Sequence, residues 1–247
     1  MSALEPYAPL NEPKPLAETV WLVNGPEIGM SYGPMTLPFT TRMTVVRLRS
    51  GDLWVHSPIA PDAALFAAID ALGPVRHLVA PSTLHYWYMA DWIGRYPEAT
   101  TYAVPDLATK AKRGFRIDRT LEHSERFVWQ DEIDWVLVAG SAVSEAVFHV
   151  REQRVTILVD LIENFEPARI HRRLIRWLVR LGRADGHTPV DFRMTFWPNR
   201  KRVAEAVARV LAWSTDKLVI AHGKPFTTGG GEILRRELAW AIKGAAR

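Results

Sequence analysis

The chain has 247 residues, of which 48% are hydrophobic and 23% are charged, and this composition excludes extended disorder. Its net charge of +4 is small for this length, so composition alone does not indicate nucleic-acid binding, and none is expected. Cysteine is absent, which excludes disulfides, thiolate metal ligands and a cysteine nucleophile. No run of about 18 apolar residues predicts a transmembrane helix.

The N-terminal segment MSALEPYAPLNEPKPL is rich in proline and has no basic start followed by an apolar core. It does not have the pattern of a secretory signal, so we expect a cytoplasmic protein. We predict an N-terminal arm over residues 1–16 and a single domain over residues 17–247, because α/β domains commonly reach this length. The next segment, ETVWLVNGPEI, is predicted to be an edge strand.

Strands and helices alternate along the rest of the chain. TRMTVVRLRSGDLWVHSPI predicts two strands joined by a tight turn, and a helix is expected from Pro61 to Ala71. RHLVA predicts a buried strand, followed by a helix over residues 85–96. Further strands are predicted at TTYAV, RFVWQ, DWVLVAG, EAVFHV, RVTILVD and KLVIAHG, and further helices over residues 105–114, 167–182, 200–214 and 231–247. This alternation indicates an α/β fold.

The helix predicted over residues 167–182 is both apolar and basic. Its apolar residues at helical spacing are Ile170, Leu174, Leu178 and Leu181, and its arginines are Arg169, Arg172, Arg173, Arg176, Arg180 and Arg183. Such a helix can contact an anionic membrane peripherally or hold phosphates. We favour a solvated outer helix, because arginine stems also cover apolar surface in ordinary folds.

Three polar residues each follow an apolar run of strand character: His85 in RHLVAPSTLH, Asp160 in RVTILVD and His222 in KLVIAHG. A strand delivers its last side chain to one edge of a sheet, so three such ends on one sheet would bring two imidazoles and a carboxylate together. This pattern predicts a metal site. For each residue alone, a cap or a satisfied turn residue is the ordinary alternative.

The order of these segments resembles the metallo-β-lactamase superfamily, where a T-H-x-H-x-D-H motif, a G-D pair and a glycine-flanked histidine follow three strands. The corresponding segments are 80–86, 159–160 and 221–223. The resemblance begins near Glu18 and is closest to an uncharacterised, degenerate branch, on the blocks LWVHSPIAP, APSTLHYW, EAVFHV and TILVDLIENFEP. It implies a metallo-β-lactamase-like αββα sandwich.

The departures from the family motif concern the metal ligands. Pro81 and Thr83 stand in the places of two histidines of the first metal position, and Ser141 stands where a third would be. Neither proline nor threonine offers an imidazole nitrogen, so the resemblance implies that the first metal position is lost.

In the second metal position, the resemblance implies a set of three ligands. His85 takes the place of an aspartate, Tyr86 takes the place of a histidine, and Asp160 and His222 are retained. Two histidines and one carboxylate suit zinc, and non-haem Fe(II) uses the same set. We therefore expect one divalent ion, zinc or iron, at His85, Asp160 and His222, with a protein that binds none as the alternative.

Other residues are candidates for supporting roles. In the resembled fold His56 lies near the site, and Glu145 could act as an additional ligand or a general base. Hydrogen bonds to a substrate could come from Ser82, Thr83, Tyr86 and Ser141. No G-x-S-x-G elbow occurs, so a Ser-His-Asp triad among these residues is not predicted.

The leading hypothesis is a metal-dependent hydrolase of a small-molecule ester, thioester, amide or phosphoester. Two alternatives stay open: a non-catalytic member of the fold that binds a ligand or a protein partner, and a non-haem Fe(II) redox enzyme.

Overall fold

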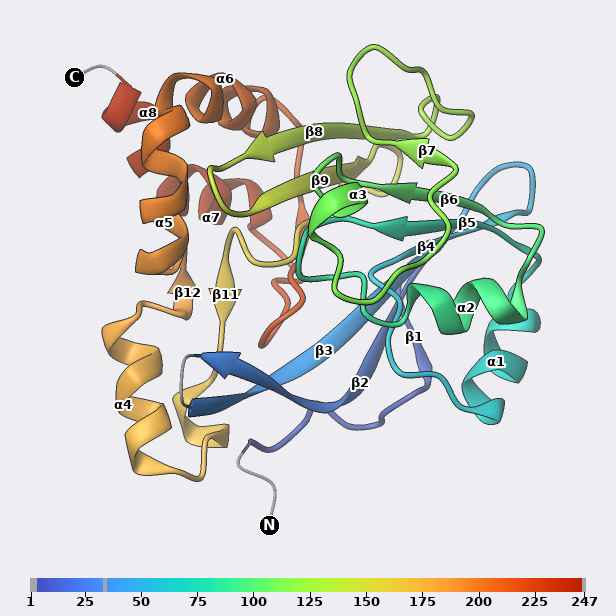
Figure 1. Ribbon diagram of the computed structural model, residues 1–247, viewed down its shortest axis with the longest axis horizontal. Helices are drawn as coiled ribbons and strands as arrows, with labels where there is room; N and C mark the ends of the chain where they lie inside the picture. The colour runs from blue at the N-terminus through green and yellow to red at the C-terminus, as the bar shows by residue number, and fades with distance from the viewer. Residues whose placement is uncertain (1–3, 33–34, 246–247) are drawn as a thin grey trace.

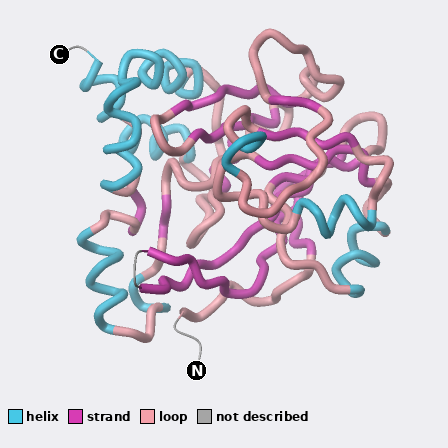
Figure 2. Tube along the Cα trace, in the orientation of Figure 1, coloured by secondary structure: helices cyan, strands magenta, loops and turns pink. Residues whose placement is uncertain are grey.

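Two β-sheets form the centre of the computed structural model, which describes residues 4–32 and 35–245, and helices lie outside them (Figures 1 and 2). Within these residues the larger sheet contains, in spatial order, β1 (Pro13–Ala17), β2 (Val20–Tyr32), β3 (Met35–Arg47), β4 (Leu53–His56), β5 (Val75–Ala80), β6 (Thr100–Ala103) and β7 (Arg119–Thr120). The smaller sheet contains β13 (Lys217–Val219), β10 (Val155–Ile157), β9 (Ser144–Val150) and β8 (Ile133–Ala139). A separate pair is formed by β11 (Glu163–Asn164) and β12 (Asp185–His187).

The helices form the outer layers (Figure 1). The larger sheet packs against α1 (Ala63–Asp70) and α2 (Met89–Arg95), whose buried residues belong to its core cluster. The smaller sheet packs against α5 (Val190–Phe196), α6 (Arg200–Leu211), α7 (Gly230–Glu237) and α8 (Ala239–Ala245). The remaining helical segments are α3 (Leu107–Lys110), η1 (Pro167–Arg169), α4 (Arg173–Leu181) and η2 (Trp197–Asn199).

Aromatic side chains from both sheets fill the space between them. Trp54 of β4 is fully buried, and its ring centroid lies 4.9 Å from that of Phe148 of β9. It also makes an edge contact with Trp129, at 6.0 Å. Side chains of this size bury large apolar areas, so they hold the sheets face to face. The predicted αββα sandwich is confirmed.

Several local predictions are confirmed because the signals were local. The turn between β3 and β4 contains Gly51 at a φ of 88°, a conformation that favours glycine. The side chain of Asp62 accepts the main-chain N–H of Leu65 at 2.7 Å and so caps α1. The helix predicted over 61–71 is observed as α1, which begins two residues later and ends one residue earlier than predicted.

The N-terminal segment packs closely onto the rest of the chain. Leu4 is buried and forms a β-bridge with Ile170, and β1 pairs with β2. The segment predicted as an edge strand forms the strand β2, but it is not at the edge of the sheet, because β1 pairs with it on its outer side. Residues 1–3 of the expected arm lie outside the described residues, as do residues 33–34 and 246–247 of the expected domain.

Five other element predictions differ from the structure. The helix expected over 105–114 spans only Leu107–Lys110, and the one expected from Gly231 is divided into α7 and α8. RFVWQ forms turns, in which Gln130 donates its N–H to the carbonyl of Phe127. The helix expected from His85 begins at Met89, and the helix over 167–182 divides into η1 and α4, because Arg172 between them is extended. The helix α5 was not predicted, since it spans two turns with mixed apolar spacing.

The helix α4 packs inward through one buried residue. Leu174 and Leu181 are each 62% exposed, whereas Ile175 is buried in a small cluster with Leu4 and Ile170. The predicted solvated outer helix is therefore observed, and two of its apolar residues are exposed to solvent. Among the described residues, no helix is long and apolar enough to cross a bilayer.

Candidate metal centre

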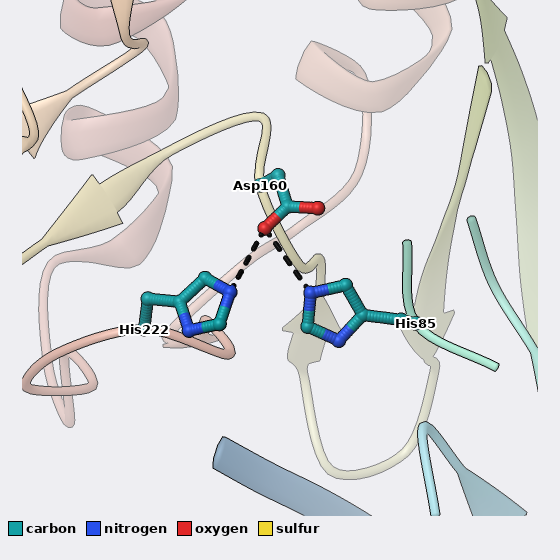
Figure 3. Close-up of side chains that lie close together, drawn as sticks. All are labelled: His85, Asp160 and His222. Carbon is teal, nitrogen blue, oxygen red and sulfur yellow. Dashed lines mark hydrogen bonds and ion pairs between the residues drawn. The ribbon is translucent and has the colours of Figure 1, made fainter. Parts of the chain in front are cut away.

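His85, Asp160 and His222 come together where the two sheets meet (Figure 3). His85 follows β5 of the larger sheet. Asp160 and His222 follow β10 and β13, which are parallel neighbours in the smaller sheet. The expectation that all three strand ends belong to one sheet was wrong, although the three side chains do converge.

Both imidazoles point their Nε2 atoms at the same carboxylate oxygen (Figure 3). Asp160 Oδ1 lies 3.1 Å from Nε2 of His85 and 3.1 Å from Nε2 of His222. Tetrahedral zinc with ligand bonds of about 2.0–2.2 Å separates its ligand atoms by roughly 3.3 Å. The observed spacing is therefore compatible with an ion shared by the three side chains.

The hydrogen bond on the far side of His222 identifies its tautomer. Nδ1 lies 2.6 Å from the main-chain carbonyl oxygen of Thr40, which can only accept, so Nδ1 carries the hydrogen. A neutral ring then presents a lone pair at Nε2, facing the lone pairs of Asp160. Despite the 3.1 Å separation, Nε2 has no hydrogen bond of acceptable geometry. A cation between the two atoms would satisfy both.

His85 is held from behind by a residue that sequence reasoning missed. Its Nδ1 lies 2.9 Å from Oγ of Ser57, which is buried and has a φ of 53°, unusual for a residue other than glycine. Metal-binding histidines ordinarily hold their second nitrogen in this way. The only signal was the position of Ser57 directly after the strand end at His56.

Burial and mutual contact set the charges of the three side chains, which are 9%, 3% and 1% exposed for His85, Asp160 and His222. Burial acts to raise the pKa of Asp160, but the charge and hydrogen bond of His85 outweigh it and hold that pKa well below its ordinary value. Burial lowers the pKa of His222. Burial also opposes the charge on His85, but Asp160 raises its pKa overall. The carboxylate is thus ionised, as a ligand must be.

Glu145 lies beside the donor set and is fully buried. Its Oε1 accepts the N–H of Val159 at 2.7 Å, and its Oε2 accepts those of Asp160 at 3.0 Å and Leu161 at 2.8 Å. Burial and the nearby Asp160 carboxylate raise its pKa, while three N–H donors favour its ionised form. Glu145 therefore holds the turn that presents Asp160.

Ser82 also acts on main-chain geometry. Its hydroxyl accepts the N–H groups of Leu84 and His85, both at 3.2 Å, and so closes the turn that presents His85. Next to it, the carbonyl of Pro81 accepts the N–H of Ala146 at 2.7 Å, which ties this turn to β9. The strand β9 thus anchors the turns of two of the three candidate ligands.

The other candidates lie around the donor set with different partners. His56 is buried against Trp54, its Nε2 has no partner, and burial followed by the charge of His85 lowers its pKa to about 3. Thr83 has a buried hydroxyl without a hydrogen-bond partner. These two are the candidates whose polar atoms stay unused.

Tyr86 and Ser141 make contacts that occupy their hydroxyl groups. The hydroxyl of Tyr86 accepts the N–H of Lys112 at 2.8 Å, and its ring stacks on Phe115. Ser141 is exposed and donates to the carbonyl of Thr195 at 2.8 Å. In this structure both hydroxyl groups therefore form hydrogen bonds with main-chain groups of the protein itself.

The main chain around His222 is held by Arg42, which sequence reasoning missed, and by the glycine that follows the histidine. The buried Arg42 donates from Nη1 to the carbonyl of Ile220 at 2.5 Å. Gly223 has a φ of 93°, and a Cβ there would lie 1.9 Å from the carbonyl oxygen of Asn164. Only glycine permits this approach, so the glycine after the histidine was the available signal.

The donor set fits one divalent ion. His222 Nε2 and Asp160 Oδ2 are buried polar atoms without hydrogen-bond partners, and imidazole with carboxylate is a set that zinc and iron accept. Across residues 4–32 and 35–245, this is the one group of three such donors close enough to share an ion.

Solved structures with the same fold are metallo-β-lactamases and flavodiiron cores. A metallo-β-lactamase from Hirschia baltica is 16% identical with a TM-score of 0.60, over 94% of this chain and 97% of that one. One from Pontibacter korlensis is 13% identical with a TM-score of 0.59, over 93% and 98%. The metal-soaked Flv1 flavodiiron core from Synechocystis sp. is 9% identical with a TM-score of 0.61, over 97% of this chain and 62% of that one.

These likenesses define the class: the protein has the metallo-β-lactamase fold, as the sequence resemblance implied. The chain belongs to the family described as "Domain of unknown function (DUF4336)", whose model matches residues 18–169. No curated protein matches it significantly. The matched segment includes His85 and Asp160 but not His222, and the predicted kinship with a degenerate branch is confirmed.

Proposed function

We propose that the protein binds one divalent metal ion through His85, Asp160 and His222 and hydrolyses a small-molecule ester, thioester, amide or phosphoester. One observation carries the proposal: two Nε2 atoms converge on one carboxylate oxygen, while Nδ1 of His85 contacts the Ser57 hydroxyl and Nδ1 of His222 donates to the carbonyl of Thr40. An ion held there would supply a Lewis acid that lowers the pKa of water to about 7.

The chain's own groups would prepare the site for that chemistry. Ser57 and the carbonyl of Thr40 orient the two imidazoles, and Glu145 holds the turn of Asp160. The burial of all three ligands keeps bulk water away, which strengthens electrostatic interactions. His85 is the most exposed ligand at 9%, so a substrate would approach along this residue and must be small.

The same burial favours a second candidate function. Side chains that are 1–9% exposed leave little surface for a substrate, so the ion would serve to hold three turns together in a non-catalytic binding protein. The iron-dependent redox alternative uses the same donors. The identity of the bound metal separates it from hydrolysis.

Metal analysis and thermal unfolding test the proposal. We expect one equivalent of metal per chain and a rise in Tm on adding zinc or Fe(II), since a ligand that binds only the folded state stabilises it by about 2.7 kcal/mol at a hundredfold excess over Kd. His85→Ala and His222→Ala should each abolish this rise.

The matched control is His149→Ala, which removes another buried histidine, bonded to Thr156 at 2.9 Å outside the site, and should keep the rise in Tm. No metal-dependent rise in the parent protein would refute metal binding. Metal binding without turnover of ester, thioester, amide and phosphoester panels would support the non-catalytic candidate. Two tightly bound ions per chain would contradict the prediction that the first metal position is lost.

A further inference from the structure

Six large apolar side chains are exposed on the helices of one segment of the chain. Their exposed fractions range from 42% to 71%, and they are Leu174, Trp177, Leu181, Val190, Met194 and Trp197. On α4 they recur at spacings of three and four residues, and on α5 with η2 at four and three, so each helix presents one apolar stripe. We call these six residues the α4–α5 face.

The two helices that carry this face are joined and lie on the same side of the protein. The N–H of Val190, at the start of α5, donates to the carbonyl of Gly182, at the end of α4, at 3.0 Å. Figure 1 shows α4, β12 and α5 following one another along the left side of the molecule. Exposed Trp and Leu side chains in such number on two successive helices mark an interaction surface.

The charge of this segment is strongly positive. Residues 170–200 contain seven arginines against two aspartates, an excess of five, whereas the whole chain carries only +4. Arg172, Arg173, Arg180 and Arg183 are exposed. The rest of the chain is therefore close to neutral, and the positive charge is concentrated where the apolar side chains are exposed.

A cationic cavity adjoins the α4–α5 face. It has a volume of about 360 Å³, and its lining includes Arg183, Arg193, Arg236, Glu237, Trp240 and Lys243. Arg193 belongs to α5, its guanidinium lies 5.5 Å from the ring centre of Trp240, and its Nε is buried without a hydrogen-bond partner. The one acidic group, Glu237, is already paired with Arg236 and His187. The remaining donors suit a phosphate group.

We propose that the α4–α5 face docks on an anionic membrane surface, with the cavity receiving the phosphate of a lipid headgroup. Basic residues beside exposed Trp and Leu are the composition of interfacial helices, and tryptophan favours the headgroup region. A nucleic acid would engage the arginines but not six apolar side chains. This inference uses residues outside the metal centre and does not depend on the proposed function.

Vesicle sedimentation with the full chain tests the proposal. The protein should bind vesicles of phosphatidylcholine with phosphatidylserine, should bind vesicles of phosphatidylcholine alone far more weakly, and should be released by salt. The double change Trp177→Ser with Leu181→Ser should weaken binding at least about tenfold. The matched control Trp87→Ser, at a tryptophan that is 49% exposed outside the face, should leave it unchanged.

Charge changes separate a lipid headgroup from free phosphate. Arg183→Glu should weaken vesicle binding at least about fivefold, because each basic residue near an anionic surface contributes about 1 kcal/mol. If inorganic phosphate raises the Tm of the parent protein but the parent does not bind the vesicles, the membrane assignment is overturned. Vesicle binding by the Trp177→Ser, Leu181→Ser variant that equals that of the parent would also overturn it. So would duplex DNA binding that is retained in this variant. A parent protein that is a dimer in solution, with the variant a monomer, would assign the face to a second copy of the chain instead.

Discussion

Replacing Glu145 by glutamine should weaken metal binding without removing any ligand. The carboxylate accepts N–H groups from three consecutive residues around Asp160, two at Oε2 and one at Oε1. A glutamine has one carbonyl oxygen, so its best orientation keeps the two bonds at the Oε2 position. Its amide N–H₂ then faces the N–H of Val159, and two buried donors oppose each other.

The expected cost follows from these contacts. One hydrogen bond to a buried N–H is lost and that donor is left facing another donor, which costs about 1–3 kcal/mol. We expect the free energy of unfolding to fall by about 1–3 kcal/mol. Because the turn of Asp160 is no longer held, metal affinity should also fall about 10- to 100-fold, as it does when partners that orient a ligand are removed.

Isothermal titration with zinc and urea unfolding of the metal-free protein measure the two effects separately. Glu237→Gln is the matched control, because Glu237 is another buried carboxylate with two partners, on α7 outside the site. It should lower stability and leave zinc affinity unchanged. If Glu145→Gln binds zinc as tightly as the parent, the positioning role is refuted.

Three further outcomes are expected. Ser57→Ala should weaken zinc binding about tenfold in titrations, because the Nδ1 of His85 loses its partner; unchanged affinity would count against it. Gly223→Ala should lower the free energy of unfolding in urea by about 4 kcal/mol, since its Cβ would meet a main-chain carbonyl at a positive φ, while Gly114→Ala, with open space around it, should cost little. Burial lowers the pKa of His77 to about 4. Below about pH 6.5 the unfolded chain therefore binds a proton that the folded chain does not, and the free energy of unfolding decreases as the pH is lowered. Relative to His77→Gln, the parent should therefore lose up to about 1.4 kcal/mol per pH unit between about pH 6 and 4.5 in urea titrations; parallel profiles would contradict this.

The convergence of His85, Asp160 and His222 could be predicted from sequence because each follows an apolar strand, and the family resemblance supplied their order. The residues that orient them could not. His222 is held by the carbonyl of Thr40, 182 positions away, and a main-chain carbonyl leaves no mark in the sequence. Ser57 has no motif around it that indicates a contact with His85.

The orientation of α4 could not be predicted from the sequence, for a different reason. Helical spacing shows that Leu174 and Leu181 share a face, but it does not show whether anything covers that face. The exposed stripe became visible only when the packing of Ile175 against Leu4 was known. Likewise, the apolar runs before His85 and Asp160 indicate strands without indicating that the strands belong to different sheets.

The separation of the site residues along the chain has a consequence for folding kinetics. His85 and Asp160 are 75 positions apart, and the contact of His222 with Thr40 spans 182. Closing loops of this length is slow, so these contacts form late. An ion bound by them would leave the folding rate nearly unchanged and would slow unfolding. In a cell, the lifetime of the folded chain against proteases would then follow the supply of metal.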